Sequence, residues 1–593
     1  MDEPTPAAPR TAADLLSFAD VRDIDELIEA LRRLESGEWT PDQFRAFRLA
    51  RGTYGQRQPD VNMLRVKIPQ GILGAEQLEA LADVAERFSR GFGHLTTRQN
   101  VQLHFVKLDT VADAQTALAR VGLTTREACG NTVRNVTACP MAGVCAGEAF
   151  DVTAYGHAVS RHFLRRAENQ SLPRKFKIAF SGCPDDCAAG AINDVGCVAR
   201  VRDGVRGFEV KVAGGLSTTP ENAHRLYDFL PADELIPVIE AVLAVFAKHG
   251  NRHNKMRARL KYVVRKLGWE GTRAEIEREL AAIRGAGRGR RPIDPSPGEA
   301  LARAPSLPLA PAAARPAADA GFERWRATNV RAQKQRGFSA VTVRLLRGDV
   351  TAAQLVGLAG LARAHGDGLA RATIDQNLLL RFVSDARVEA LHRGLAALGL
   401  AEADAHTIAD VTSCPGADSC NLAVTAPREL ASALMARLSG PGTSAGDEAA
   451  VAAARDLSIK ISGCPNSCGQ HHIAGFGLHG GMRRIAGRII PEYTLHLGGG
   501  VDGSGATFGR QLVKLPARRV PEALVVLLRL YAERRADGES ALAFFRRLRQ
   551  EDLRAALGDL ARIDEATAAP EDFLDLGGAR EFEVKTGPGE CAA

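Results

Sequence analysis

The sequence is poor in aromatic residues and has no long apolar run. Phe, Trp and Tyr make up 5% of its 593 residues. No apolar stretch reaches the roughly 18 residues that a membrane-spanning helix needs. The longest candidate, residues 235–250, contains Glu240 and predicts a core-facing helix. The net charge of +7 is small for this length, and no nucleic-acid recognition motif is present. We therefore expect neither a membrane nor a nucleic-acid partner.

Nucleotide-binding motifs are missing as well. The sequence has no Walker A motif, and although GGGVDG at residues 498–503 fits G-x-G-x-x-G, no helical pattern follows it. A glycine-rich turn is the better interpretation of that run. The sequence therefore offers no motif for binding NAD(P)H or a nucleoside triphosphate.

Cysteine, by contrast, occurs in a pattern that is written twice. The two quartets are Cys139-x5-Cys145 with Cys183-x3-Cys187, and Cys414-x5-Cys420 with Cys464-x3-Cys468. The surroundings repeat too, since NTVRNVTACPMAGVC matches HTIADVTSCPGADSC and FSGCPDDC matches KISGCPNSC. Four thiolates can hold the four irons of a cubane, so each quartet is a complete ligand set for a [4Fe-4S] cluster.

Two other uses of the cysteines compete with iron–sulfur binding. Disulfides fit poorly, because the sequence opens with acidic, proline-rich MDEPTPAAPR and not with an apolar secretion signal, and we expect a cytoplasmic location. Structural zinc is the stronger rival, although its cysteine pairs usually stand two to four residues apart. Cys129, Cys197 and Cys591 fall outside both quartets and receive no role.

A proline follows the first cysteine of each closely spaced pair, at Pro184 and Pro465. Proline is favoured in the first turn of a helix, where its missing N–H costs nothing. We therefore expect a helix to begin at each proline and to point free N–H groups at a negatively charged cluster. The second cysteine of the pair would then lie one turn further along.

The chain divides at residues 285–320, a stretch rich in Ala, Pro, Arg and Gly. On both sides of it the same order of elements recurs: strand, helix, strand and helix, followed by the cysteine segments. Each half is therefore predicted to be a small α+β unit followed by a larger α/β unit that holds a cluster. The whole chain is read as an internal duplication.

The two copies differ in charge at four matched positions. The first half carries Arg98, Arg134, Lys175 and Lys177, where the second half carries Asp375, Ala409, Asp456 and Ser458. Drift at a surface would also change charges, but all four positions lie in the best-matched blocks. Two Arg and two Lys that converge near a metal centre are what an oxyanion site requires. The first half is therefore predicted to bind a small anion.

These segments resemble the sulfite and nitrite reductases that contain a sirohaem coupled to a [4Fe-4S] cluster. Within that family they resemble the haemoprotein subunit of the assimilatory type. The resemblance covers residues 44–562 and rests on LTTRQNVQLH, TVRNVT, LPRKFK and GCPNSCGQ. It implies two ferredoxin-like half-domains and two α/β sirohaem and iron–sulfur domains about a pseudo-twofold axis. It also implies substrate contacts through the four first-half cations, Arg98, Arg134, Lys175 and Lys177.

The resemblance assigns the cluster to the second half of the chain. By position its ligands are Cys414, Cys420, Cys464 and Cys468, with Cys468 bridging to the sirohaem iron and Asn466 among the cofactor-binding residues. The chain departs from the best-known single-cluster members because its first half keeps four cysteines. Cys139, Cys145, Cys183 and Cys187 are therefore candidates for a second cluster.

The domain limits that follow from the repeat and the resemblance are these: an N-terminal extension at 1–43, the first ferredoxin-like half-domain at 44–125, the first sirohaem and iron–sulfur type domain at 126–284, the linker at 285–320, the second ferredoxin-like half-domain at 321–405, the second, cluster-bearing domain at 406–562, and a tail at 563–593.

The implied activity is the six-electron reduction of sulfite to sulfide, with electrons from ferredoxin or a reductase flavoprotein. Reduction of nitrite to ammonia at the same site is the alternative. Nitrite-specific members of the family tend to carry Asn where this chain has Lys177, and an additional positive charge favours the sulfite dianion over the nitrite monoanion. Sulfite is therefore the preferred substrate in this interpretation.

Two functions of other classes stay open at this point. One is a monooxygenase of cobalamin synthesis that acts on a corrin precursor, although such a large substrate has no need of four converging cations. The other is a non-catalytic iron–sulfur protein that only transfers electrons. Absorption bands of sirohaem in the purified protein would argue against the second.

Overall fold

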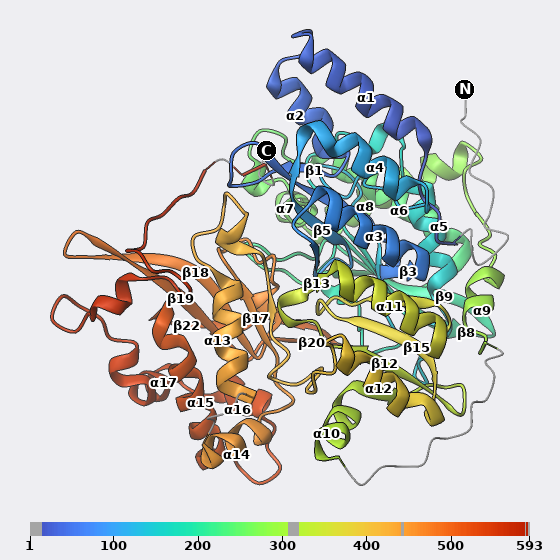
Figure 1. Cartoon of the computed structure of the whole chain (residues 1–593). Coiled ribbons are helices and arrows are strands. Elements are labelled where there is room, and N and C mark those ends of the chain that lie inside the picture. Colours follow the sequence, from blue (N-terminus) through green and yellow to red (C-terminus); the bar gives the residue numbers. More distant parts are fainter. Residues whose placement is uncertain (1–14, 306–318, 440–443, 588, 591–593) are drawn as a thin grey trace.

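Four five-stranded sheets, with helices packed on them, make up most of the computed structural model (Figure 1). The structure describes residues 15–305, 319–439, 444–587 and 589–590. Cys591 therefore lies outside the described residues, as does part of the 285–320 linker. None of the helices in these described ranges is long and apolar enough to cross a membrane.

Two of the sheets are antiparallel and belong to the two ferredoxin-like units. The first has the order β1 (Thr53–Gly55), β2 (Val61–Val66), β5 (Val101–Lys107), β4 (Phe92–Leu95) and β13 (Asp349–Thr351). The second has the order β11 (Val330–Ala332), β12 (Phe338–Val343), β15 (Leu378–Ser384), β14 (Leu369–Ala372) and β3 (Ile72–Gly74). Their helices are α3 (Ala75–Phe88), α4 (Val111–Ala119), α11 (Ala352–His365) and α12 (Val388–Ala397). This confirms the predicted order of strand, helix, strand and helix in both halves.

The two units exchange a short edge strand, which the sequence did not predict. Strand β13 from the second half pairs with β4, and β3 from the first half pairs with β14. Helices α3 and α11 lie side by side (Figure 1), and one hydrophobic core runs through both units, from Leu64 and Leu103 to Val341 and Leu380. The two half-domains therefore form one structural body, which fixes the two halves of the chain against each other.

The backbone repeats the duplication at positions where side chains rarely allow it. Left-handed φ values occur at the matched pairs Gln70 and Arg347, Gln99 and Gln376, Phe105 and Phe382, Asp186 and Ser467, and Ala189 and Gln470. Positive φ is costly for residues other than glycine, so such pairs do not arise independently at so many matched sites. The backbone conformation therefore confirms the internal duplication that the amino-acid sequence indicated.

The other two sheets belong to the α/β units and share one topology. Their orders are β10 (His224–Pro231), β9 (Val205–Val212), β8 (Val195–Arg202), β7 (Ile178–Ser181) and β6 (Thr137–Ala138), and β16 (Thr412–Ser413), β17 (Ile459–Ser462), β18 (Phe476–Ile485), β19 (Arg488–Leu497) and β22 (Arg510–Pro516). In each sheet the first three strands in chain order are parallel, and the later ones are antiparallel.

Helices cover these two sheets and bury separate cores. In the first unit they are α5 (Thr153–Phe163), α6 (Leu235–His249), α7 (Leu260–Leu267) and α8 (Trp269–Gly285). In the second they are α13 (Pro427–Ser439), α14 (Ala445–Ala453), α15 (Val520–Arg534), α16 (Ala541–Arg547) and α17 (Gln550–Leu557). The apolar stretch around Glu240 is α6, as predicted. GGGVDG forms two residues before β20 (Gly500–Asp502), that strand itself and the first residue of its turn to β21 (Gly505–Thr507), so a strand and not a helix follows it.

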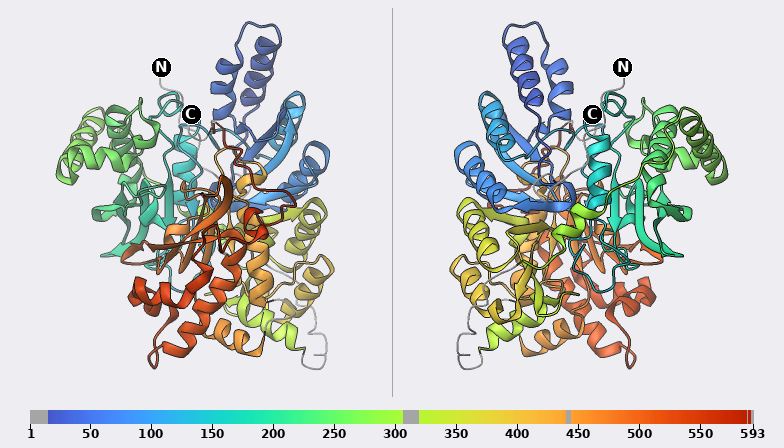
Figure 2. Two further views of the ribbon diagram at one scale, coloured as in Figure 1. Left: turned by 90° about the vertical axis from the view of Figure 1, so that its left-hand side faces the viewer. Right: turned by 90° about the vertical axis from the view of Figure 1, so that its right-hand side faces the viewer.

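Segments outside the repeat pack against it. A helical hairpin, α1 (Val21–Glu35) and α2 (Pro41–Ala50), packs with α1 against α4 and projects from the rest of the molecule (Figure 2). The predicted linker contains a short helix, α9 (Ser296–Leu301), whose Glu299 pairs with Arg206 at 2.8 Å, and α10 (Ala320–Asn329) opens the second half. Near the C-terminal end, Glu590 receives two hydrogen bonds from Arg48, so the tail returns to the first half.

Candidate functional site

The fold brings each cysteine quartet together because its strands are parallel. Cys139 directly follows β6 and Cys183 comes two residues after β7, while Cys414 and Cys464 follow β16 and β17 in the same way. The carboxyl ends of neighbouring parallel strands meet at one edge of a sheet. The first cysteine of each pair therefore lies at that edge, and the loop behind it supplies the second.

The four thiols of the first quartet are in mutual contact. The Sγ atoms of Cys183 and Cys187 are 3.4 Å apart. The pKa of Cys183 is raised chiefly by its hydrogen bond with Cys187, and the pKa of Cys187 is raised chiefly by its hydrogen bond with Cys139. Burial raises the pKa of Cys145, which also contacts Cys183. Thiols packed this closely can all ionise only when a cation shares the space between them.

The second quartet converges in the same way. Burial raises the pKa of Cys414 well above its ordinary value, and the nearby Cys468, Cys464 and Cys420 raise it further. The N–H of Gly463 donates to Cys414 Sγ at 3.3 Å. Cys468 is the exposed member of this quartet. Both predicted ligand sets are therefore assembled in the structure.

The predicted helices at Pro184 and Pro465 are wrong. Both segments are turns, because Asp186 and Ser467 adopt φ values of 52° and 58°, which a right-handed helix cannot contain. In the first half the free N–H groups that follow are used by a side chain, since the Asp186 carboxylate accepts from Gly190 and Ala191 at 2.9 and 3.0 Å. The N–H groups of these turns are thus not the helix N-terminus that the sequence suggested.

The predicted cations of the first half lie within electrostatic range of one another. Arg98 and Lys175 both lower the pKa of Lys177, after burial and Arg259, and its pKa stands well below the ordinary 10.5. Burial, followed by the repulsion of Arg259 and Arg134, lowers the pKa of Arg98 to about 9. Like charges held together at such cost mark a site for an anion.

The side chains of these cations differ in how many of their N–H groups are hydrogen-bonded within the protein. Arg98 donates to Asn193 Oδ1 at 2.7 Å and to Asn135 O at 2.5 Å, which leaves its Nε without a partner. Arg134 donates to the carbonyls of Gly130 and Ala128 at 2.8 and 3.1 Å. The ammonium of Lys177, in contrast, makes no hydrogen bond or ion pair with the residues that the structure describes, and its side chain is half-buried. Lys177 is therefore the cation most available to a ligand.

Sequence reasoning missed two charged residues of this group. Asp194 is fully buried and binds Arg259 through both oxygens, at 2.7 and 3.2 Å, and it accepts from the backbone N–H of Lys177 at 2.8 Å. Asp194 is the acid that offsets part of the positive charge. Arg259 comes directly before α7. Its pairing with Asp194, which directly precedes β8 and is 65 residues away in the sequence, carried no signal in the sequence.

The anion-binding half and the second quartet meet at one place. Thr97, next to Arg98, donates from Oγ1 to the carbonyl of Cys468 at 2.9 Å. Ser217, in the loop after β9, lies 3.5 Å from the Oδ1 of Asn466. The backbone of Cys468 thus lies against the loop of the first half that carries Arg98. In the second half, the residue that matches Arg98 is Asp375, and it forms an ion pair with Lys460 at 2.7 Å.

A buried cation without partners shows that an anionic group fits the surroundings of the first quartet. Arg371 is fully buried, yet all three of its guanidinium nitrogens lack a partner among the described residues. Burial and the neighbouring Arg381 lower its pKa to about 9, and Asp151, Asp367 and Cys139 are the nearby groups that offset part of this. A buried guanidinium without hydrogen bonds is costly, and a cluster with four thiolates offers it the acceptors that are missing. Lys177, which has no partner among the described residues, gives the same argument for an anionic ligand beside the cations of the first half.

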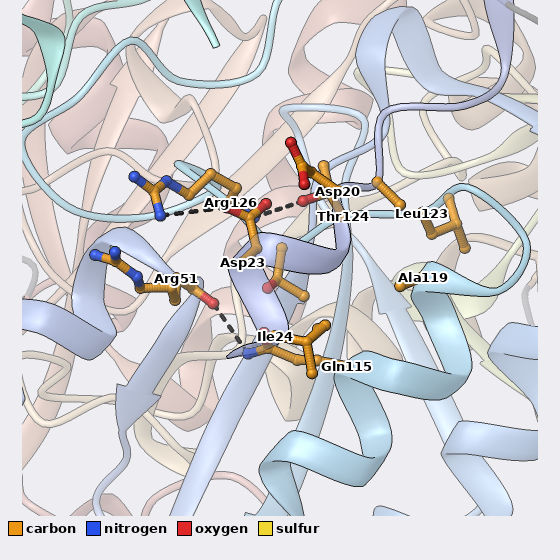
Figure 3. A pocket seen from close by; sticks show the side chains of 11 residues that line it. Asp20, Asp23, Ile24, Arg51, Gln115, Ala119, Leu123, Thr124 and Arg126 are labelled. Carbon is orange, nitrogen blue, oxygen red and sulfur yellow. Dashed lines mark hydrogen bonds and ion pairs between the residues drawn. The ribbon is translucent and has the colours of Figure 1, made fainter. Parts of the chain in front are cut away.

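A surface pocket elsewhere in the molecule is not this site. It lies between α1 and α4 and is lined by Asp23, Arg51, Gln115 and Arg126, among others (Figure 3). Ion pairs fill it, with Asp23 bound to Arg126 at 3.3 Å and to Arg165 at 2.6 Å. None of the predicted cofactor or substrate residues lines it, so its place is structural: it ties the helical hairpin to the body.

The fold and the paired cysteine quartets define a duplicated iron–sulfur reductase, and the chain belongs to the nitrite and sulfite reductase family. The family model described as "Nitrite and sulphite reductase 4Fe-4S domain" matches residues 129–283, and the one described as "Nitrite/Sulfite reductase ferredoxin-like half domain" matches residues 54–121 and 331–398. The protein is accordingly an oxidoreductase whose cofactors are sirohaem and a [4Fe-4S] cluster.

Particular relatives include enzymes named for both substrates. "Sulfite reductase [ferredoxin]" of Mycobacterium tuberculosis is 30% identical over 501 residues, with 83% of each chain covered. "Ferredoxin--nitrite reductase" of Synechococcus elongatus is 31% identical over 473 residues, covering 79% of this chain and 85% of the relative. The solved structure of Mycobacterium tuberculosis NirA matches with a TM-score of 0.74 and 27% identity, covering 92% of this chain and 98% of NirA.

Proposed function

We propose that this enzyme reduces sulfite to sulfide in six one-electron steps. The observation that carries the proposal is the half-buried ammonium of Lys177, which has no partner among the described residues and stands beside Arg98, Lys175 and Arg259. A dianion gains about twice as much from such a group of positive charges as a monoanion does. Relatives of both specificities match about equally well, so the charge of the site and not the degree of similarity favours sulfite.

The chain's own residues divide the work of the site. Cys414, Cys420, Cys464 and Cys468 are the proposed ligands of the [4Fe-4S] cluster, with Asn466 beside the last of them. Cys468 is the ligand proposed to be shared with sirohaem, because it is exposed and faces the first half. When bound, the sirohaem with its coupled cluster would supply electrons one at a time to the oxyanion substrate.

The cations orient the substrate and supply protons. Arg98 and Arg134 are proposed to hold substrate oxygens with N–H groups that now bind carbonyls, which requires their side chains to shift. Lys177 is the proposed proton donor, because burial and the neighbouring Arg259, Arg98 and Lys175 lower its pKa, so its ammonium gives up a proton more easily than an ordinary lysine does. Lys175, two residues away on the same stretch, contributes a second positive charge. Each oxygen that leaves as water needs two protons, so a nearby ammonium has a direct use.

We further propose that the first quartet holds a second [4Fe-4S] cluster. The contacts among Cys139, Cys145, Cys183 and Cys187 support it, as does the orphaned Arg371. A chain with two clusters and one sirohaem contains about nine iron atoms, and a chain with one cluster about five. Iron analysis of Cys183→Ala, with Cys197→Ala as a control at a buried cysteine outside both quartets, separates the two cases. Equal iron in wild type and Cys183→Ala contradicts the second cluster.

A ferredoxin is the proposed electron donor. Two of the relatives carry ferredoxin in their names, and GGGVDG, the segment that fits a dinucleotide motif, contributes strand β20 of a hairpin and is followed by a strand and not by a helix. The positive net charge also suits an acidic redox protein. Reduced ferredoxin should therefore support turnover, whereas NADPH alone should not.

The deciding experiment is a steady-state assay of the anaerobically purified holoenzyme with reduced methyl viologen, comparing kcat/KM for sulfite and nitrite. Sulfide formation with a higher kcat/KM for sulfite is the expected result. A strong preference for nitrite, with ammonia as product, would overturn the substrate proposal and leave the site intact. Turnover of neither anion by protein with full iron and sirohaem content would refute the proposal that this site is a reductase.

A further inference from the structure

Four histidines are packed together in the second half, away from the predicted substrate residues. They are His471 and His472 in the short helix η11 (His471–Ile473), His479 in β18 and His496 in β19. The ring centroids of His471 lie 4.1, 4.9 and 5.0 Å from those of His472, His479 and His496. Protein atoms cover His471 completely, and His472 and His496 are also buried. Such a group needs an explanation, because imidazoles are polar and costly to bury.

The hydrogen bonds of these rings leave nitrogen lone pairs directed inward. The Nε2–H of His472 donates to the carbonyl of Ser217 at 2.8 Å, so its Nδ1 carries a lone pair. His471 bonds through Nδ1 to Ser462 Oγ at 3.0 Å, and its Nε2 has no partner among the described residues. One nitrogen from each of His471, His472 and His496 lies within 4.8 Å of the other two. Outer hydrogen bonds of this kind are what fix histidines as metal ligands.

The surroundings keep the imidazoles neutral. Burial and the neighbouring histidines lower the pKa of His496 to about 3 and that of His479 to about 4. The charged groups that act on the cluster are Lys261, on His472, and Lys514, on His479, and both are positive. Neutral imidazole is the form that binds a metal ion. A hydrogen-bonded pair exists only between His479 Nδ1 and His496 Nε2, at 2.9 Å, which leaves His471 Nε2 unexplained within the described residues.

The duplication shows that these histidines are not required by the fold. The matched residues of the first half are Gly190, Ala191, Val198 and Lys211 for His471, His472, His479 and His496. The same short helix and the same strand pairing therefore form without any imidazole. Four separate changes to one residue type, all converging on one point, indicate a common ligand.

We propose that His471, His472 and His496 bind a divalent zinc ion, independently of the reductase function proposed above. Three neutral imidazoles suit Zn²⁺ in tetrahedral geometry, and His479 is placed to give the fourth ligand once His496 exchanges its hydrogen bond for the ion. The ion would join η11 to β19 and, through Ser217, the second half to the first. Its role is structural: it holds the segment that begins three residues after Cys468.

Zinc X-ray absorption on the holoenzyme, grown and purified with ZnCl2 and then freed of loose metal by a chelator, tests the proposal directly. The zinc edge is distinct from that of iron, so sirohaem and clusters do not interfere. We expect about one zinc per chain with nitrogen neighbours at about 2.0–2.1 Å and no sulfur shell. A sulfur shell near 2.3 Å would place the zinc in a cysteine quartet and overturn the proposal. Protein without retained zinc would overturn it too.

A matched set of variants assigns the zinc to its residues. His472→Gln combined with His496→Gln should remove nearly all bound zinc, whereas Cys145→Ala, which breaks the first quartet, should leave the zinc content unchanged. Because the double variant can fail to fold, His471→Gln is measured alongside, as a single change at the unpartnered nitrogen. Sirohaem absorption reports whether each variant is folded. Folded histidine variants that keep full zinc would refute the assignment.

Discussion

Replacing Lys177 by Gln should change substrate preference more than it changes overall activity. The substitution keeps a polar side chain that is only one atom shorter and removes one positive charge from a group that also contains Arg98, Lys175 and Arg259. Its backbone N–H, which donates to Asp194, is unaffected. Anything that depends on packing is therefore preserved, and the charge alone is tested.

The size of the effect follows from the position of the ammonium. Lys177 is half-buried, so an effective dielectric constant between those of water and of a protein surface, about 40, is appropriate. A unit charge about 4 Å from a substrate oxyanion then contributes about 2 kcal/mol for a monoanion and about 4 kcal/mol for a dianion. The ratio of kcat/KM for sulfite to that for nitrite should consequently fall by about 30-fold, since 1.4 kcal/mol corresponds to a factor of ten.

The assay is the methyl viologen reaction with each anion in turn, at matched sirohaem content. Lys248→Gln is the control, because Lys248 is an exposed lysine paired with Glu275 and Glu279 on the surface. That variant should leave both values of kcat/KM unchanged. If Lys177→Gln lowers the two values by the same factor, Lys177 does not act through its charge on the substrate, and the electrostatic argument for sulfite fails.

Three further predictions follow from the same region. Nitrite binding should raise the lowered pKa of Lys177, so the affinity for nitrite is full below the pKa of the free enzyme and weakens as pH rises through that pKa, which lies below 10.5. Absorbance titrations with nitrite at several pH values should show this weakening, and Lys177→Gln should abolish it. Asp194→Asn leaves Arg259 buried without its acid and should cost about 3–5 kcal/mol of unfolding free energy in urea, where a loss below 1 kcal/mol would speak against the pair. Arg371→Met should make reduction of a first-quartet cluster harder by about 1–2 kcal/mol, seen as a lower potential in an EPR-monitored titration; an unchanged potential would separate Arg371 from the cluster.

The features that could be predicted are those that appear in the sequence as periodic patterns of apolar residues. The strands and helices of both ferredoxin-like units stand where alternation and helical spacing indicated, for example β5 and β15 or α3 and α11. The convergence of the cysteines was predictable too, because a ligand set repeated twice with the same spacing has few other uses. Both features depend on local sequence, and local sequence was sufficient for them.

The exchanged strands escaped prediction for a physical reason. Strands β3 and β13 have three residues each, too few for alternation to be read, and they lie directly before α3 and α11. Their partners are chosen by packing between the two units, which no single segment encodes. The helices predicted at Pro184 and Pro465 were wrong for a related reason. Proline favours a helix start, but the left-handed Asp186 and Ser467 end any helix before its first full turn.

Charged partners from distant segments were the other omission. Arg259 and Asp194 are 65 residues apart in the sequence, and only the fold of the first α/β unit brings their side chains to 2.7 Å. The histidines show the same limit, because His496 meets the others only through the pairing of β19 with β18 opposite Gly477. Matching residue types across a duplication finds positions that changed. It does not show which changed positions meet.

Comparison of the two halves in space supplies that missing step. At one pair of matched sites the first half keeps its cation, Arg98, while the second half has Asp375 bound to Lys460, so one potential anion site has been closed by an internal ion pair. At another pair the second half gains imidazoles at His471 and His472 where the first half has Gly190 and Ala191. Each half has thus lost or gained whole groups of interacting residues and not single side chains. Because isolated buried charges and imidazoles are costly, such changes persist only when their partners change with them. The asymmetry of a duplicated chain therefore points to its functional groups more directly than either half does alone.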